Sequence, residues 1–392
     1  MVNSRELPGL NVLRVLASLY MVMFHFSPIM LPQWVQTFFA RGAADTDLFF
    51  LLSGYLLAHL SLGRPLAGQE QSRFIWRRLA RIVPVNLLSV LLFLLVNKFH
   101  LPAFADGHTV LLSLLMIQSW VVGGSHTMTI VAWSLSCLLF FYLLFPLLLP
   151  ALERRRTPVL LGLLLGLWLL GAFVLPELRR WPGPFLLSTW TVYLHNSPLM
   201  RLPEFVLGMG AAVLVRRSGP PPVWLIWGAL PLVTALMLWS GGESMPINNG
   251  VFAPLALLLL LAFLNPGRAV ERLGASRLVR QLADASICIY LFQMLFRKLI
   301  GEWVLTPLHL SWNLWTMLGY LGVLILAAVA ADRWLCRPAT ALLLRRSAVT
   351  VKPAQSAPLR VPPLPSVQPL VPDQVVLRLA RPDEAAEILL AR

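Results

Sequence analysis

Long apolar runs, each close to the length needed to cross a bilayer, recur along most of the chain. A helix needs about 20 such residues to cross the hydrocarbon core, and no strand-like alternation of apolar and polar residues competes with this pattern. The run at 109–122 is shorter, so we expect it to lie along the surface or to re-enter. The other runs predict about ten transmembrane helices, near 10–30, 44–61, 82–99, 131–150, 158–175, 203–216, 223–240, 250–264, 285–300 and 313–332.

The pattern changes after Arg346. Residues 347–392 contain eight prolines and no long apolar run, which predicts a mostly disordered cytoplasmic tail. Within the tail, Pro382–Leu390 is typical of one short helix. The sequence therefore predicts a transmembrane domain over 1–346 and a tail over 347–392.

The amino-acid composition agrees with a helical membrane protein. Hydrophobic residues make up 58% of the chain and charged residues 12%, with a mean hydropathy of +0.74, whereas soluble domains carry about 25% charged residues. These values exclude an ordinary soluble domain and predict an all-α, polytopic integral membrane protein. The net charge of +15 does not predict nucleic-acid binding, because cytoplasmic loops of membrane proteins accumulate Lys and Arg. Cys137, Cys288 and Cys336 have neither paired nor ligand spacing, so we expect no disulfide and no metal site.

The distribution of basic residues predicts the orientation. If the N-terminus is cytoplasmic, nineteen arginines fall on the inner segments before residue 347, against seven Lys and Arg on the outer ones. Positive residues concentrate on the cytoplasmic side. We therefore expect both termini on the cytoplasmic side of the membrane.

The first apolar run, Leu7–Phe26, contains Arg14 and His25. Eleven positions are close to three helical turns, so both side chains share one face, about 16 Å apart along the axis. Ionisable residues inside a membrane usually mark a working site. The alternative is structural: Arg14 snorkels to the headgroups, and His25 is a satisfied histidine near the opposite interface.

Two more polar groups are candidates for chemistry. Arginines recur at helical spacing before the third run, where forked side chains can clamp phosphates or serve as an orientation signal and lipid contact; they are Arg73, Arg77, Arg78 and Arg81. Asp45 and Asp47 begin the second run, where a carboxylate can orient His25 as a base or simply belong to a loop. Ser53 and Gly54 are small residues of the kind that allow close helix approach.

Six blocks, in order, resemble the membrane acyltransferase-3 family, and together they cover roughly residues 7–335. The blocks are LNVLRVLASLYMVMFHF (Leu10–Phe26), DLFFLLSGYL (Asp47–Leu56), RRLARIVP (Arg77–Pro84), WSLSCLLFFYLLFPLLLP (Trp133–Pro150), RLPEFVLGMG (Arg201–Gly210) and ASICIYLFQMLF (Ala285–Phe296). Members of this family O-acylate bacterial surface glycans and some small molecules.

The resemblance implies transfer of an acyl group, expected to be acetyl, from acyl-CoA to a hydroxyl of a cell-surface or lipid-linked glycan. His25 would act as base or transient acyl carrier, Arg14 would polarise the thioester, and the four arginines would bind the donor phosphates. Acetyl-CoA or another acyl-CoA would be the co-substrate, with no bound cofactor, and membrane lipids would be further partners. Supporting roles are expected for Asp45, Asp47, Ser53, Trp133, Ser136, Tyr142, Arg201, Glu204, Tyr290 and Gln293.

The sequence departs from the family pattern at three ionisable positions. Asn11 stands where the family usually has Asp, Leu138 and Leu139 stand where it has an acidic residue, and Gln293 stands where it commonly has His. A glutamine forms hydrogen bonds but does not shuttle a proton near neutral pH. Two other functions therefore remain open: a transporter that uses the same polar stripe as its pathway, and a catalytically degenerate partner protein.

Overall fold

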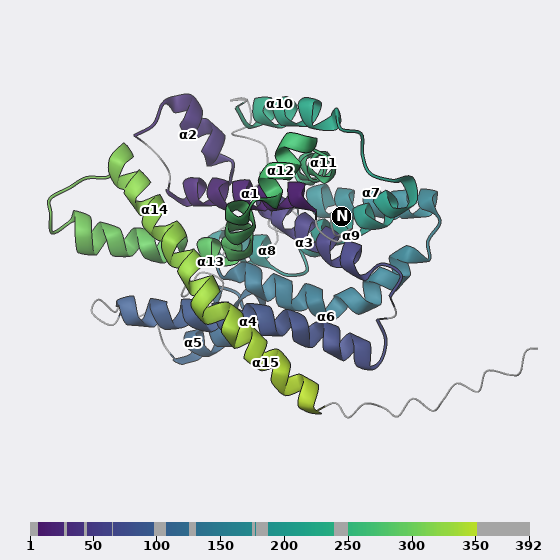
Figure 1. Cartoon of the computed structure of the whole chain (residues 1–392), viewed down its shortest axis with the longest axis horizontal. Coiled ribbons are helices and arrows are strands. Elements are labelled where there is room, and N and C mark those ends of the chain that lie inside the picture. Colours follow the sequence, from purple (N-terminus) through teal and green to yellow (C-terminus); the bar gives the residue numbers. More distant parts are fainter. Residues whose placement is uncertain are drawn as a thin grey trace, which may run out of the picture. The chain divides into compact units, whose positions relative to one another are not determined.

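The computed structural model describes residues 7–26, 30–42, 45–64, 66–97, 107–124, 131–174, 177, 187–238 and 250–350. Every regular element in these ranges is a helix (Figure 1), which confirms the all-α prediction. The described helices up to Ala348 belong to one compact unit. The predicted tail helix at Pro382–Leu390 lies outside the described residues.

The helices in chain order begin with α1 (Pro8–Phe26), α2 (Gln33–Ala40), α3 (Asp45–Ser61), α4 (Gln69–Asn97), α5 (Gly107–Leu114), α6 (Trp133–Glu153), α7 (Thr157–Leu169) and α8 (Leu187–Asn196). They continue with α9 (Leu202–Ser218), α10 (Leu225–Leu238), α11 (Ala253–Leu264), α12 (Arg268–Ala275), α13 (Arg277–Ile300), α14 (Leu314–Ala331) and α15 (Arg337–Thr350). Short π-helical segments prolong α7 and α13 and join α14 to α15.

Six described helices are long and apolar enough to cross a membrane, so the predicted count of about ten is not confirmed. The six are Pro8–Phe26, Gln69–Val96, Trp133–Glu153, Thr157–Val174, Arg277–Leu305 and Leu314–Arg345. A seventh is possible if α11 and α12, which meet at 87°, form one broken span. The break has a local cause, because Pro266 cannot continue a helix and Gly267 has φ 92°.

The remaining predicted spans, at 44–61, 203–216 and 223–240, correspond to α3, α9 and α10, which have 17, 17 and 14 residues. The structure therefore does not confirm these three as membrane crossings. The doubtful run at 109–122 holds the eight-residue helix α5. Such a helix is about 12 Å long, too short to cross, as predicted.

The last predicted span ends too early. The helical path continues from α14 to Thr350, so Arg333, Arg337, Arg345 and Arg346 lie on a helix rather than in a loop. Thr340 donates a hydrogen bond to the carbonyl of Ala80 (2.9 Å), and the Trp76 indole donates to the carbonyl of Leu343 (3.3 Å). Helix α15 thus packs along the first part of α4, which carries the arginine cluster.

Helices α3 and α9 approach closely through two glycines. A Cβ added at Gly54 would lie 2.1 Å from the carbonyl oxygen of Phe205, and one at Gly208 would lie 2.0 Å from that of Leu51. Any larger residue would separate the backbones. The prediction that Gly54 permits close helix packing is therefore confirmed.

Helix α1 packs against α3, α11, α12 and α13. Different faces of α1 therefore meet different partners, and two cavities lie beside it. The candidate chemistry lies around this helix.

Candidate active site

His25 lies in the last turn of α1, and the structure fixes its tautomer. Its Nδ1 lies 3.0 Å from the carbonyl oxygen of Met21, one turn earlier. A carbonyl only accepts hydrogen bonds, so Nδ1 carries the proton and Nε2 keeps its lone pair. This is the form in which a histidine can accept a proton or attack an electrophile.

The end of α1 is held in place from α13. Arg297 donates a hydrogen bond to the backbone carbonyl of His25 (2.7 Å), and its guanidinium lies over the Phe26 ring, 5.5 Å from the centroid. The Gln293 side chain interacts with the His25 ring. The Nε2 of Gln293 donates a hydrogen bond to the carbonyl of Tyr290 (3.0 Å). The buried Oε1 of Gln293 has no partner within hydrogen-bonding distance and angle. Gln293 is therefore a direct neighbour of His25.

A cavity of about 300 Å³ lies between α1, α3, α4, α6 and α13, and we call it the arginine cavity. Arg14, Arg78 and Arg81 line it, together with Tyr142 and Ser286. Among the described residues that line it, none is a carboxylate. Three cations without a lining anion make this cavity suited to a phosphate-bearing ligand.

Arg14 is fixed at the wall of the arginine cavity by its neighbours on α13 and α1. Its Nη2 donates to Ser286 Oγ (3.1 Å), and the hydroxyl of Ser18 donates to the Arg14 carbonyl (2.7 Å). The Tyr142 hydroxyl lies within electrostatic reach of Arg14, Arg78 and Arg81. The three arginines and Tyr142 therefore line the same cavity.

The arginine cluster on α4 divides into two pairs. Arg78 and Arg81 line the cavity, and the Arg78 guanidinium lies over Phe74 at 5.4 Å while its buried Nε has no hydrogen-bond partner. Arg81 is exposed, as are Arg73 and Arg77, but Arg73 and Arg77 do not line the cavity, and Arg73 pairs with Glu70 on the same helix. The structure therefore does not bring the four predicted donor-binding arginines together.

The carboxylates expected beside His25 lie elsewhere. Asp47 accepts a hydrogen bond from Arg201 Nη1 (3.0 Å), and Glu204 accepts from the same atom (3.3 Å), with all three side chains at most 2% exposed. Arg201 also contacts the ring and the backbone carbonyl of His195. Asp45 lines a different cavity. The interpretation of Asp47 as the orienter of His25 is therefore corrected: it belongs to a buried ion group that joins α3 to α9.

The other predicted residues have mixed positions. Ser53 lines the arginine cavity, so it does not only fill space between helices. Tyr290 lines it as well and donates its hydroxyl proton to the Val131 carbonyl (2.9 Å). Trp133 lies under the Arg201 guanidinium at 5.7 Å, and Ser136 Oγ accepts from the Ser119 amide (3.5 Å). Trp133 and Ser136 thus serve packing and loop anchoring.

The arginine cavity reaches Met21 on α1, but His25 itself does not line it. Met21, whose carbonyl holds the imidazole, lines the cavity. His25 is four residues further along α1, about 6 Å in axial rise. Leu138, at one of the positions where an acidic residue was expected, also lines the cavity. That part of the wall is consequently apolar and carries no anion beside the arginines.

Two residues near the site were not predicted from the sequence. Ser286 binds Arg14 and Arg297 binds the end of α1. Ser286, Tyr290 and Gln293 follow an i, i+4, i+7 spacing on α13, which places them on one face. This spacing is the feature of the sequence from which Ser286 could have been predicted. Within the described part of the chain, no group of three His, Cys, Asp or Glu side chains is placed to hold a metal ion.

Comparison with known proteins supports the resemblance noted in the sequence. The chain is 29% identical to the acyltransferase MdmB of Streptomyces mycarofaciens, over 66% of this chain and 63% of that protein. It is also 29% identical to the exopolysaccharide production protein ExoZ of Rhizobium meliloti, over 65% of this chain and 76% of that protein. A shorter match, 29% identical, covers 40% of this chain and 27% of the O-acetyltransferase OatA of Staphylococcus aureus.

The match to MdmB thus covers less than two thirds of that protein's own length. No solved structure matches the chain significantly. Residues 7–332 match the acyltransferase domain that defines the acyltransferase-3 family. This stretch includes the arginine cavity and His25, and the chain belongs to that family.

Proposed function

We propose that this protein is a membrane-embedded O-acyltransferase of the bacterial inner membrane. It would move an acyl group, acetyl in the first instance, from cytoplasmic acyl-CoA to a hydroxyl of a cell-surface or lipid-linked glycan. One observation carries the proposal: a cavity lined by three arginines reaches Met21, one helical turn before His25, and the Nδ1 hydrogen bond of His25 leaves Nε2 as the atom that can act as a base. The family membership supports the same reaction class.

The donor would bind with its phosphates at Arg78 and Arg81, because guanidinium groups form charge-assisted, forked hydrogen bonds to phosphate. Arg14 lies on α1, about 10 Å of axial rise before Met21, on the wall of the same cavity. A slender pantetheine arm would run from the arginines along this wall. The thioester would then lie towards the His25 end of α1.

In the transfer step, His25 Nε2 would take the proton of the acceptor hydroxyl while its oxygen attacks the thioester carbonyl carbon. The tetrahedral intermediate would collapse as the carbon–sulfur bond breaks. The coenzyme A thiolate would then take the proton from the imidazolium, which leaves an ester and free thiol. Proton transfer by a positioned base contributes roughly 10²–10⁴-fold to rate. The Nδ1–Met21 hydrogen bond would also stabilise the imidazolium, since Nδ1 donates in both protonation states.

The test is transfer of labelled acetyl groups from coenzyme A to cell-surface glycan. His25→Ala should lower incorporation by at least about a hundredfold while the protein still inserts and accumulates. His59→Ala is the matched control, because that ring stacks on Tyr55 in α3 and does not line the arginine cavity. Normal incorporation by the His25 variant would overturn the proposal and leave a structural role for this residue.

The same Nε2 atom could carry the acyl group transiently instead of acting as a base, and one further measurement separates the two. Purified protein is incubated with labelled acetyl-CoA and no acceptor, then digested and analysed by mass spectrometry. Label on the peptide that contains His25 would establish an acyl carrier. Absence of label together with full transfer activity would establish the base. Mass spectrometry of surface glycans from cells with and without the protein would identify the acceptor.

A further inference from the structure

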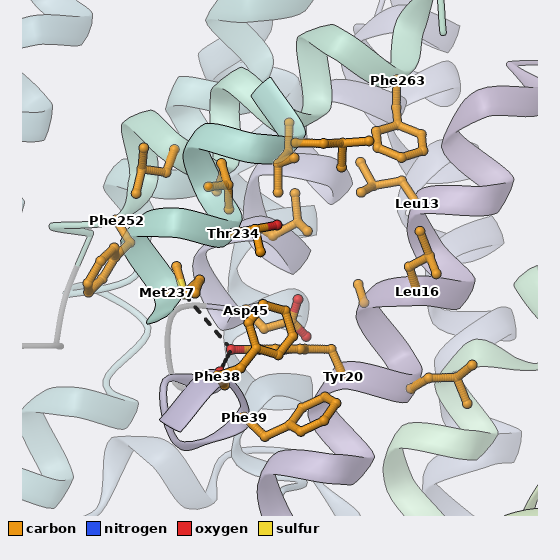
Figure 2. A pocket seen from close by; sticks show the side chains of 18 of the residues that line it. Leu13, Leu16, Tyr20, Phe38, Phe39, Asp45, Thr234, Met237, Phe252 and Phe263 are labelled. Atoms are coloured by element: carbon orange, nitrogen blue, oxygen red, sulfur yellow. Dashed lines mark hydrogen bonds between the residues drawn. The ribbon is translucent and has the colours of Figure 1, made fainter. Parts of the chain in front are cut away.

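A second cavity, which we call the apolar pocket, lies on another face of α1 and is unrelated to the arginines. It has a volume of about 380 Å³ and lies between α1, α2, α3, α10 and α11. Figure 2 shows Leu13 and Phe263 at one end and Phe38 and Phe39 at the other. Its volume is in the range of small-molecule sites.

The lining is almost entirely hydrocarbon, with one exception. Asp45 is the one charged side chain among the described residues that line the pocket. It is 7% exposed, and its Oδ2 is buried with no hydrogen-bond partner. Figure 2 shows its carboxylate among Tyr20, Phe38 and Thr234. A buried acceptor without a donor is costly, so this oxygen points to a ligand that brings its own donor.

Among the described residues that line the pocket, the Tyr20 hydroxyl does not supply that donor. The Tyr20 hydroxyl donates to the Phe38 carbonyl at 2.6 Å, with a further contact of 3.9 Å to Met237 Sδ. Its single proton is therefore committed to the backbone of α2. A hydroxyl on the occupant would satisfy the Asp45 oxygen without placing a second charge in an apolar site.

The pocket opens where the neighbouring helices present apolar surface. Leu16 on α1 and Leu230 on α10 line it and are 50% and 39% exposed. Helix α1 is a candidate membrane span, and α11 belongs to the broken candidate span. These exposed leucines give the pocket an apolar rim, across which a hydrocarbon chain can enter without crossing water.

We infer that the apolar pocket binds one hydrocarbon chain of a hydroxyl-bearing lipid, with Asp45 accepting a hydrogen bond from the hydroxyl. The occupant is a neutral single-chain lipid alcohol or the corresponding part of a larger lipid. A phosphate-headed lipid would place an anion against a carboxylate. This inference concerns binding alone and does not depend on the proposed acyl transfer.

The test uses the full-length protein in lipid nanodiscs and two photoreactive probes of equal length, a sixteen-carbon alcohol and the corresponding alkane. Peptides from α1, α10 and α11 should be labelled at lower concentrations of the alcohol than of the alkane. Asp45→Asn keeps the shape but replaces one acceptor oxygen by a donor. It should weaken alcohol labelling by at least about tenfold and leave alkane labelling unchanged.

A blocking variant controls for the position of the site. Thr234→Trp, at an exposed position that lines the pocket, should abolish labelling by both probes. Ala235→Trp is the matched control, because Ala235 is the exposed neighbour on α10 that does not line the pocket. Equal labelling by the alcohol and the alkane would overturn the assignment of Asp45. Unchanged labelling of Thr234→Trp would overturn the site itself.

Discussion

The arginine cluster on α4 offers a sharp prediction, because the structure divides it into two pairs of equal charge. Arg78→Gln/Arg81→Gln removes two cations from the arginine cavity, whereas Arg73→Gln/Arg77→Gln removes two from the exposed surface of the same helix. The sequence alone treats the four residues as equivalent. The structure predicts that only the first pair holds the donor.

The magnitude follows from the contacts at stake. A hydrogen bond to a charged group contributes about 1.5–3 kcal/mol, so losing two should weaken coenzyme A binding by at least about a hundredfold. The exposed pair should change binding much less, since the Arg73–Glu70 bridge is solvent-exposed and such bridges contribute about 0–1 kcal/mol. Both variants lose the same charge, so any effect on membrane orientation is shared.

The assay is equilibrium binding of labelled coenzyme A to purified protein in detergent, at low and high salt. The cavity pair should lower affinity at both ionic strengths, because Arg78 is partly buried and its charge is screened less than that of a fully exposed side chain. If both double variants lose the same affinity, all four arginines attract coenzyme A non-specifically through their charge. Unchanged affinity in the cavity variant would refute the arginine cavity as the donor site.

Three further predictions concern topology and stability. A reporter fused within 347–392 should be active in the cytoplasm, as the positive-inside bias predicts, and activity confined to the periplasm would contradict it. Gly208→Ala should destabilise the protein by about 1–3 kcal/mol in thermal unfolding, because its Cβ would meet a backbone oxygen of α3 at 2.0 Å; Gly162→Ala, which meets nothing within 4 Å, is the control. Arg201→Met should cost about 3–5 kcal/mol by leaving two buried carboxylates unpaired, and adding Asp47→Asn should restore part of the loss. No recovery in that double variant would mean that the cost comes from packing.

The sequence by itself determined the class of protein and much of its local order. Apolar runs and low charge predicted helices in a membrane, because a bilayer without water requires backbone groups to pair within each segment. Helical period placed Arg14 and His25 on one face of α1. The spacing of the six blocks predicted the family, and the match over 7–332 confirmed it. These features depend on residues close together in the chain.

Only the tertiary structure decided which polar groups meet. The sequence predicts that Asp47 begins its helix at a depth close to that of His25. In the structure Asp47 pairs instead with Arg201, 154 residues away. Gln293, which the sequence presented as the loss of a family histidine, is a direct neighbour of the His25 ring. Periodicity shows which residues share a helix face, but the helix packed against that face is chosen by contacts distant in sequence.

The number of crossings and the two cavities were decided in the same way. Helices α3 and α9 have 17 residues each, and the distance between them is set by the close contact at Gly54 and Gly208. Arg78 and Arg81 differ from Arg73 and Arg77 because other helices close a cavity over one face of α4. A cavity is the space that several helices leave unfilled, so it has no signature in any one segment of the sequence.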